Sequence, residues 1–331
     1  MTYRLRLRIR ILGIATIATV GMVALAGCTP SSTGDGDAPA DGESRAITVA
    51  TLPTANLAAI HIGLDQGFFE EEGLDVTTQD VQTGSEMITG ALGGTFDFFC
   101  VGYVPVFTAV SQGLPIRLIA GNDVGGATVE TDWQITMAGA DSPVQSVEDL
   151  ATATIAVNAL KGVAEIAVRA SLQAQGIDDS GIKLTEIPFP EMPAALAQGT
   201  VDAAYLPEPF VTGILAAGGR VVDTPYAVLG DGFPNGAWGI SQQVIEADPE
   251  LVAAFTRAIT RSLEFAAENP DAVREIIPTY TQVPAETAAV IRLPVFSAEL
   301  DDDLLEELLG YTEEYGVIED AVSLEDIIYR P

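Results

Sequence analysis

The stretch that decides the fold is ATLPTANLAAIHIGLDQGFFEEEGLDV, residues 50–76. It begins within a β-rich run, residues 47–52, that ends at Pro53. Residues 58–72 then have a helical pattern that stops at Gly73, and residues 74–77 restart a strand. Because β-branched residues favour strands and glycine commonly follows the last turn of a helix, the stretch predicts a strand–helix–strand unit of a parallel sheet.

The same alternation continues toward the C-terminus. Further strands are predicted at residues 96–101, 116–120, 134–138, 154–157, 183–187, 202–205 and 220–222. Helices are predicted at residues 85–92, 105–112, 146–150, 163–175, 193–198 and 209–217. Alternating strands and helices of this length indicate an α/β protein with mainly parallel sheets. After Gly239 the pattern turns mainly helical, with helix starts at Asp248-Pro249, Asn269-Pro270 and Pro284. We expect this tail to return and cover the first lobe of the protein, which is built from the N-terminal strands and helices.

The N-terminus has the pattern of a secretory signal. Arg4, Arg6, Arg8 and Arg10 precede an apolar run, residues 11–27, and small residues lead to Cys28. The run Leu25-Ala26-Gly27-Cys28 resembles the lipobox of bacterial lipoproteins, which implies cleavage before Cys28 and lipidation of its thiol. We therefore predict a signal peptide at 1–27, a disordered tether at 28–45, and an extracytoplasmic protein lipid-anchored to the bacterial cell membrane. An uncleaved transmembrane anchor and an unmodified Cys28 are the alternatives.

Composition excludes several classes of function. The 331 residues carry a formal charge of −32, which repels nucleic acid. Only two cysteines and one histidine are present, so neither a disulfide framework nor a His/Cys metal site is expected. Cys28 is assigned to lipid, and Cys100, in the apolar run Phe98-Phe99-Cys100-Val101, to the core. We expect no cofactor and no metal.

Three further phrases carry a family resemblance. They are ALGGTFDFFCVG at 91–102, SPVQSVEDLATATIAV at 142–157 and MPAALAQGTVDAAYLPEPF at 192–210. In this order, with the first stretch, they resemble the periplasmic solute-binding proteins of ABC importers of the nitrate/sulfonate/taurine type. That group is similar to the proteins that bind thiamine-pyrimidine precursors. The resemblance covers residues 47–269, with Ala151-Thr152-Ala153 departing from the usual Lys/Gly-rich turn.

The resemblance implies a two-lobed, type II periplasmic-binding-protein-like α/β fold with a helical C-terminal tail. Two βα lobes are joined by two crossing strands, which we expect at 134–139 and 237–241. Lobe one would then comprise 46–133 plus 242–331, and lobe two 139–236. A small solute would bind between the lobes of a monomer and be delivered to ABC permease and ATPase subunits, with no catalysis.

The candidate site residues, apart from Trp238 beside an expected crossing, lie where strands end and helices begin, since ligands of such sheets bind at the carboxyl ends of strands and at helix N-termini. They are Asn56, His61, Gly84, Ser85, Gly102, Tyr103, Lys161, Gly162, Glu208 and Trp238. Each has a structural alternative. Asn56 and Ser85 could cap helices, Gly102 and Glu208 could shape turns, and Tyr103 and Lys161 could be solvated. His61 could be structural, and Trp238, like Trp133, could only pack.

The solute class stays open at the level of sequence. Phe99, Tyr103, Tyr205 and Trp238 would suit a flat heterocycle such as a pyrimidine, whereas Lys161 is the one cation we place near the cleft. Sulfonate-like solutes and pyrimidine-like heterocycles therefore rank together, with nitrate behind.

The alternative functions are a secreted, lipid-anchored hydrolase that uses carboxylates, and an adhesive module. No Gly-x-Ser-x-Gly elbow is present, and a catalytic triad would have to use His61.

Overall fold

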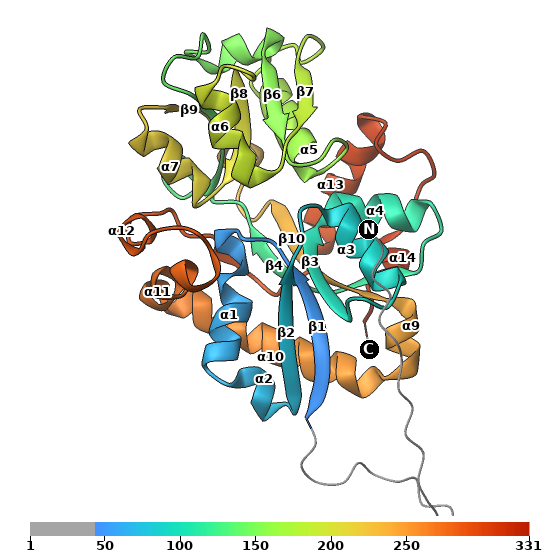
Figure 1. The fold of residues 1–331 in the computed structure, drawn as a ribbon. Coiled ribbons are helices and arrows are strands. Elements are labelled where there is room, and N and C mark those ends of the chain that lie inside the picture. The colour runs from blue at the N-terminus through green and yellow to red at the C-terminus, as the bar shows by residue number, and fades with distance from the viewer. Residues whose placement is uncertain (1–43, 331) are drawn as a thin grey trace, which may run out of the picture. The chain divides into compact units, whose positions relative to one another are not determined.

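The computed structural model describes residues 44–330, and these residues contain two β-sheets. The first sheet has the strand order β11-β4-β10-β3-β1-β2 (Figure 1). Its strands are β1 (Arg45–Thr51), β2 (Leu74–Asp80), β3 (Phe98–Gly102), β4 (Ile116–Val124), β10 (Pro234–Ser241) and β11 (Val295–Phe296). Strands β1, β2 and β3 run parallel, whereas β10 is antiparallel to β3 and to β4.

The second sheet has the order β7-β6-β8-β5-β9. Its strands are β5 (Gln134–Ala138), β6 (Thr154–Val157), β7 (Lys183–Glu186), β8 (Ala203–Pro207) and β9 (Arg220–Asp223). We call the first sheet and its helices lobe one, and the second sheet and its helices lobe two. The expectation of an α/β fold built from two βα lobes is confirmed.

Helices fill the connections in both lobes. Lobe one has η1 (Ala55–Leu57), α1 (Ala58–Asp65), α2 (Phe68–Glu71), α3 (Gly84–Leu92) and α4 (Tyr103–Ser111). Lobe two has η2 (Val147–Thr152), α5 (Val163–Ala174), η3 (Phe189–Glu191), α6 (Met192–Ala197) and α7 (Phe210–Ala216). Helix α8 (Pro225–Leu229) follows β9. None of the helices in residues 44–330 combines the length and the apolar character that a membrane span requires.

The deciding stretch forms the expected strand–helix–strand unit with one difference. The helical segment 58–72 is divided, because Gly67 adopts a left-handed backbone (φ 76°) between α1 and α2. A left-handed residue cannot continue a right-handed helix, and glycine takes that conformation without steric cost. Strand β1 begins at Arg45, so the tether expected at 28–45 ends at least one residue early, and residues 28–43 lie outside the described part of the chain.

The C-terminal helices return to lobe one. They are α9 (Gln242–Ala247), α10 (Pro249–Glu268), α11 (Pro270–Tyr280), α12 (Ala285–Ala288), α13 (Asp302–Glu314) and α14 (Leu324–Ile327). Asp248 caps α10 by accepting from the Leu251 backbone N–H at 3.0 Å, as its place before Pro249 predicts. Phe255 of α10 stacks on Phe98 of β3 with ring centroids 3.8 Å apart. Figure 1 shows α10 passing along this sheet.

The chain passes between the lobes earlier than we expected. The segment 134–139 lies in the second sheet, since β5 pairs with β8 and β9 along its length. The segment 237–241 lies in the first sheet, since β10 pairs with β3 and β4. The two crossings are therefore the irregular segment 125–133 and the segment 224–233, which contains α8.

These crossings are bonded to each other. Both carboxylate oxygens of Asp132, in the first crossing, accept backbone N–H groups, and one of them binds Tyr226 and Ala227 at the start of α8. Burial raises the pKa of Asp132 to about 7, because its bonds to neutral backbone groups only partly offset the loss of hydration.

Candidate functional site

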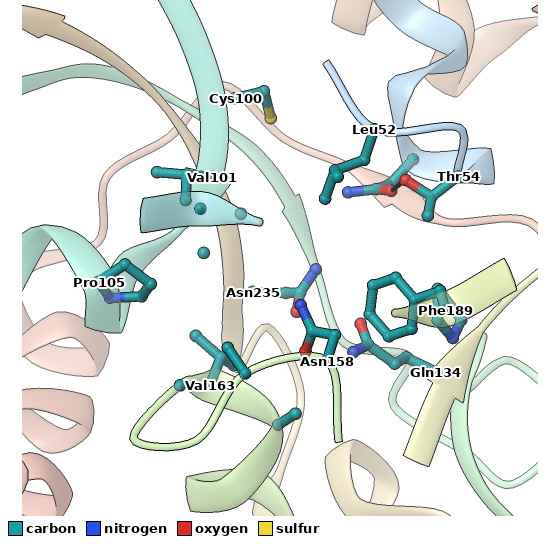
Figure 2. Close-up of a pocket in the computed structure, with 18 of the residues that line it drawn as sticks. Leu52, Thr54, Cys100, Val101, Pro105, Gln134, Asn158, Val163, Phe189 and Asn235 are labelled. Carbon is teal, nitrogen blue, oxygen red and sulfur yellow. Dashed lines mark hydrogen bonds between the residues drawn. The ribbon is translucent and has the colours of Figure 1, made fainter. Parts of the chain in front are cut away.

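A pocket lies between the lobes, at the carboxyl ends of strands from both sheets (Figure 2). Lobe one contributes the loops after β1 and β3, and lobe two contributes the loops after β6 and β8. The cavity measures about 80 Å³, the space of a few water molecules. The residues that line it include Leu52, Thr54, Asn56, Gly84, Val101, Gly102, Trp133, Gln134, Asn158, Gly162, Val163, Phe189, Pro207 and Asn235. A site at the mouths of two open α/β sheets matches the usual position of ligands in such folds.

Two glycines allow the lobes to approach closely here. Gly102 precedes α4, and a Cβ atom at this position would lie 2.9 Å from Cγ2 of Val163 in lobe two. Gly162 precedes α5. Neither residue has a side chain to bond the first N–H groups of its helix, so partial positive charge from both helix starts is directed toward the pocket.

The lobe-one wall of the pocket rests on a buried carboxylate, Asp123, which is 1% exposed. Its Oδ1 accepts from the Nδ2 of Asn56 at 2.9 Å and of Asn122 at 2.6 Å. Its Oδ2 accepts from Nδ2 of Asn235 at 2.6 Å. Three side-chain amides therefore converge on one carboxylate, with no cation bonded to it among the described residues.

The remaining polar atoms of this wall are also bonded. Oδ1 of Asn56 accepts from the Thr54 hydroxyl at 2.7 Å. Oδ1 of Asn235 accepts from the Tyr226 hydroxyl. Oδ1 of Asn122 accepts from the Trp238 indole at 3.0 Å. In this wall the three amide oxygens are thus bonded within the protein, and each amide donates at least one N–H to Asp123.

The Asp123 carboxylate affects the pKa values of residues around the pocket. Burial raises its pKa to about 6, and the three amide bonds act in the opposite direction. Burial also raises the pKa of Cys100 and Tyr103, and the Asp123 charge adds to both increases. Because Cys100 lines the pocket and Tyr103 starts α4, this part of the cavity lies in a negative field.

The lobe-two wall differs, because its side-chain amides have no protein partner. Gln134, the first residue of β5, is 5% exposed, and Asn158 follows β6. Within residues 44–330 neither side-chain amide makes a hydrogen bond, and Figure 2 shows both pointing into the cavity. Phe189, from η3, also lines the pocket. This wall therefore offers donors and acceptors without a partner among the described residues, and an aromatic ring lines the same cavity.

Contacts between the lobes flank the pocket. The backbone N–H of Ala55 donates to the carbonyl oxygen of Glu208 at 3.1 Å. Oε1 of Glu208 accepts from the Arg292 backbone N–H at 3.1 Å, so this buried lobe-two carboxylate also binds the C-terminal tail. On α13, the Tyr315 hydroxyl lies 3.0 Å from Oε1 of Gln173 in lobe two.

Four of the ten candidate residues line the pocket, namely Asn56, Gly84, Gly102 and Gly162. Ser85 is exposed on α3, next to Gly84. Lys161 is exposed and has a left-handed backbone (φ 55°), and its backbone N–H donates to Glu165. Glu208 lies next to Pro207, which lines the pocket, but its carboxylate is turned toward Thr212 and Arg292.

The three aromatic candidates lie elsewhere. Trp238 is fully buried in β10, where it packs edge-on against Phe255, so a stacking role toward a solute is not supported. Tyr103 is buried beneath the start of α4. His61 stacks on Tyr280 with ring centroids 3.9 Å apart, and burial lowers its pKa to about 4. Phe99 and Tyr205, which we expected near a heterocycle, are fully buried core residues.

Sequence reasoning missed four of the polar residues that build the pocket, namely Asn122, Asp123, Gln134 and Asn235. One local signal was present, because Asn122-Asp123 lies near the end of a strand whose other residues are apolar except Arg117. A buried Asn-Asp pair needs hydrogen-bond partners, and strand ends are where ligands bind. Trp133, which we interpreted as packing, lines the pocket and donates its indole N–H to the Val124 carbonyl at 3.0 Å.

The side chains that line the pocket are uncharged types. The residues lining it include no histidine, carboxylate, lysine or arginine. In the described residues no cluster of three or more His, Cys, Asp or Glu side chains is placed to hold a metal ion. The arrangement suits the enclosure of a small molecule by hydrogen bonds and apolar contacts.

Comparison with known proteins places this geometry in a family. The model of the NMT1-like family matches residues 40–280. The chain is 26% identical over 284 residues to the riboflavin-binding protein RibY of Chloroflexus aurantiacus, covering 81% of this chain and 76% of that protein. It is 22% identical over 334 residues to the formylaminopyrimidine-binding protein of Halalkalibacterium halodurans, covering 91% and 93% of the two chains.

A solved structure shares the fold at low identity. It is the alkanesulfonate-binding protein SsuA of Xanthomonas axonopodis pv. citri bound to MOPS, with a TM-score of 0.74, 14% identity, and coverage of 88% of this chain and 100% of that one. The two-lobed periplasmic-binding-protein-like fold that the sequence implied is thereby confirmed. The chain belongs to the NMT1-like family.

Proposed function

We propose that this chain is the extracytoplasmic solute-binding component of an ABC importer. The observation that carries the proposal is the pocket between the two lobes, which is lined from both sides and has no charged side chain among its lining residues. The relatives in the comparison are named for the small molecules that they bind. The solute is a small organic molecule, either sulfonate-like or pyrimidine-like, and the chain delivers it to a membrane permease driven by ATPase subunits.

Capture works by closure of the lobes. A solute stabilises the closed form only as far as it contacts both lobes better there than in the open form. The lobe–lobe bonds at Ala55–Glu208 and Arg292–Glu208 lie beside the pocket, and they would break when the lobes separate. The free energy of closure is therefore shared between these bonds and the solute.

The proposal includes anchoring through Cys28, which lies outside the described residues. The basic, apolar and small-residue segments before Cys28 support export and lipidation. The chain would act as a monomer held near its permease by lipid. Replacing Cys28 with serine is expected to release the exported protein from the membrane fraction, and retention of the processed variant there would contradict the anchor.

The test is thermal unfolding of the full chain with a panel of taurine, alkanesulfonates, nitrate, riboflavin and formylaminopyrimidine. A ligand present at a hundred times its dissociation constant adds about 2.7 kcal/mol to the free energy of unfolding. This should raise the unfolding midpoint by a few degrees for a chain of this size. Loss of uptake of the same solute in cells that lack the protein would complete the case, and unchanged uptake would contradict it.

A further inference from the structure

We propose that Gln134 and Asn158 are the residues that select the solute. Their side-chain amides hydrogen-bond to an uncharged, amide-like edge of a single planar ring that stacks on Phe189. This inference rests on the proposed function and makes it more specific. It follows from the difference between the two walls of the pocket.

In the lobe-one wall the amide oxygens are already bonded, and Asp123 holds each amide through one of its two N–H groups. Asn56 uses its amide nitrogen on Asp123 and its oxygen on Thr54. Asn235 uses its nitrogen on Asp123 and its oxygen on Tyr226. A solute that displaced these bonds would leave a buried carboxylate unsatisfied, which is costly, so only the second N–H of each amide stays available. We therefore assign this wall a supporting role.

The lobe-two wall has two side-chain amides that make no hydrogen bond to the described residues. Gln134 and Asn158 line the cavity, and their side chains lack protein partners among residues 44–330. Each amide presents a donor and an acceptor side by side, so it pairs with a solute edge that carries an acceptor next to a donor. Such edges occur on heterocycles with a ring nitrogen next to an amino or carbonyl group. Phe189 supplies a ring on which a planar solute can stack.

The charges favour an uncharged solute over an anion. The residues that line the pocket include no lysine or arginine. Lys161 is exposed outside it, and the Arg292 guanidinium is directed to the Asp132 carbonyl at 3.4 Å. The Asp123 carboxylate lies directly behind Asn56 and Asn235. An anion in the cavity would therefore face a buried negative charge with no cation lining the site.

The helix starts at Gly102 and Gly162 favour negative charge on the solute, since they bring partial positive charge to the cavity. Partial charge also suits a ring nitrogen or a carbonyl oxygen, which carries partial negative charge without a full charge to desolvate. The cavity of about 80 Å³ is small, which suits a solute of about one ring in this arrangement of the lobes.

The experiment is equilibrium binding of two probes, formylaminopyrimidine and taurine, to the full chain and to three variants. Gln134→Leu and Asn158→Leu keep the side-chain size and remove the amide. Gln198→Leu is the matched control, because Gln198 is an exposed lobe-two glutamine outside the pocket. We expect formylaminopyrimidine to bind the wild type and the control equally, and each pocket variant about tenfold or more weakly. The unfolding midpoints without probe should be similar in all four proteins.

Several results would overturn the inference. Equal binding of formylaminopyrimidine to the wild type and to both pocket variants would show that the amides do not read the solute, and the proposed function would stand. Binding of taurine in preference to the pyrimidine would overturn the uncharged class and also leave the function standing. Binding of neither probe would reject the ligand class, and the wider panel with the uptake assay would then decide the function separately.

Discussion

The two walls of the pocket contain the same type of side chain in opposite states. Asn56 and Asn235 of lobe one have bonded oxygens and donate to Asp123, whereas the Gln134 and Asn158 side chains of lobe two have no hydrogen-bond partner among residues 44–330. A bonded amide holds the backbone in place and contributes to folding, while an unbonded amide at a cavity contributes only when something binds. The comparison therefore separates the residues that build the pocket from those that use it.

The largest effect is expected from removing the centre of the lobe-one wall. Asp123→Ala leaves the amide nitrogens of Asn56, Asn122 and Asn235 without their acceptor. Unsatisfied buried donors cost about 1–3 kcal/mol each, so we expect the free energy of unfolding to fall by about 3 kcal/mol or more. Urea unfolding of this variant beside Asn158→Leu measures the contrast. Equal stability of the two would remove the distinction between the walls.

A smaller effect is expected from pH, and it should follow Asp123. Burial raises its pKa from 3.8 to about 6, so the folded protein binds this proton more readily than the unfolded chain. The contribution of this carboxyl to stability is therefore complete below about pH 4 and is lost as the pH rises through about 6. Between about pH 4 and 6 the free energy of unfolding of the wild type should fall by about 2–3 kcal/mol. In Asp123→Asn this fall should be absent. An identical pH profile in wild type and variant would place the titration elsewhere.

The contact between the walls can be tested at Gly102. A methyl group there would lie 2.9 Å from Cγ2 of Val163, so Gly102→Ala should oppose closure of the lobes. Overpacking of this kind costs about 1–3 kcal/mol, which predicts about tenfold weaker solute binding. The double variant Gly102→Ala/Val163→Ala should recover most of the affinity, and the absence of recovery would show that the steric contact is not the cause.

The smallest effect is spectroscopic and concerns the two tryptophans. Trp133 lines the pocket, whereas Trp238 lies in the lobe-one core. Solute binding should change the emission of wild type and of Trp238→Phe, and the change should be lost in Trp133→Phe. A signal that follows Trp238 would restore the interpretation that sequence alone suggested.

Local rules predicted much of the fold. Alternating strand and helix patterns, the Asp248-Pro249 helix start and the apolar run around Cys100 all depend on neighbours in sequence, and all are confirmed. The crossings were misplaced because β5 and β10 look like any buried strand. Only their pairing partners, which are distant in sequence, show to which sheet they belong.

The pocket was less accessible to sequence reasoning for the same reason. Its loops were identified from strand ends, and Asn56, Gly84, Gly102 and Gly162 do line it. The Asp123 network joins residues 67 and 112 positions apart, so no local pattern shows that Asn56 and Asn235 share one carboxylate. The role of Trp238 stayed open at the level of sequence, because an aromatic residue near an expected hinge looks the same whether it faces a ligand or a core.

The pairing of Leu118 with Ile328 has a consequence for the order in which the chain folds. This bridge, supported by the Tyr329 backbone N–H bond to the Leu118 carbonyl at 2.8 Å, joins β4 to the last residues that the structure describes. The second sheet is complete within residues 134–223, whereas the first needs segments from both ends of the chain. Contacts between distant segments form slowly because a long loop must close first. Lobe two is therefore expected to fold early as a contiguous unit, and lobe one to finish only when the C-terminal segment has arrived.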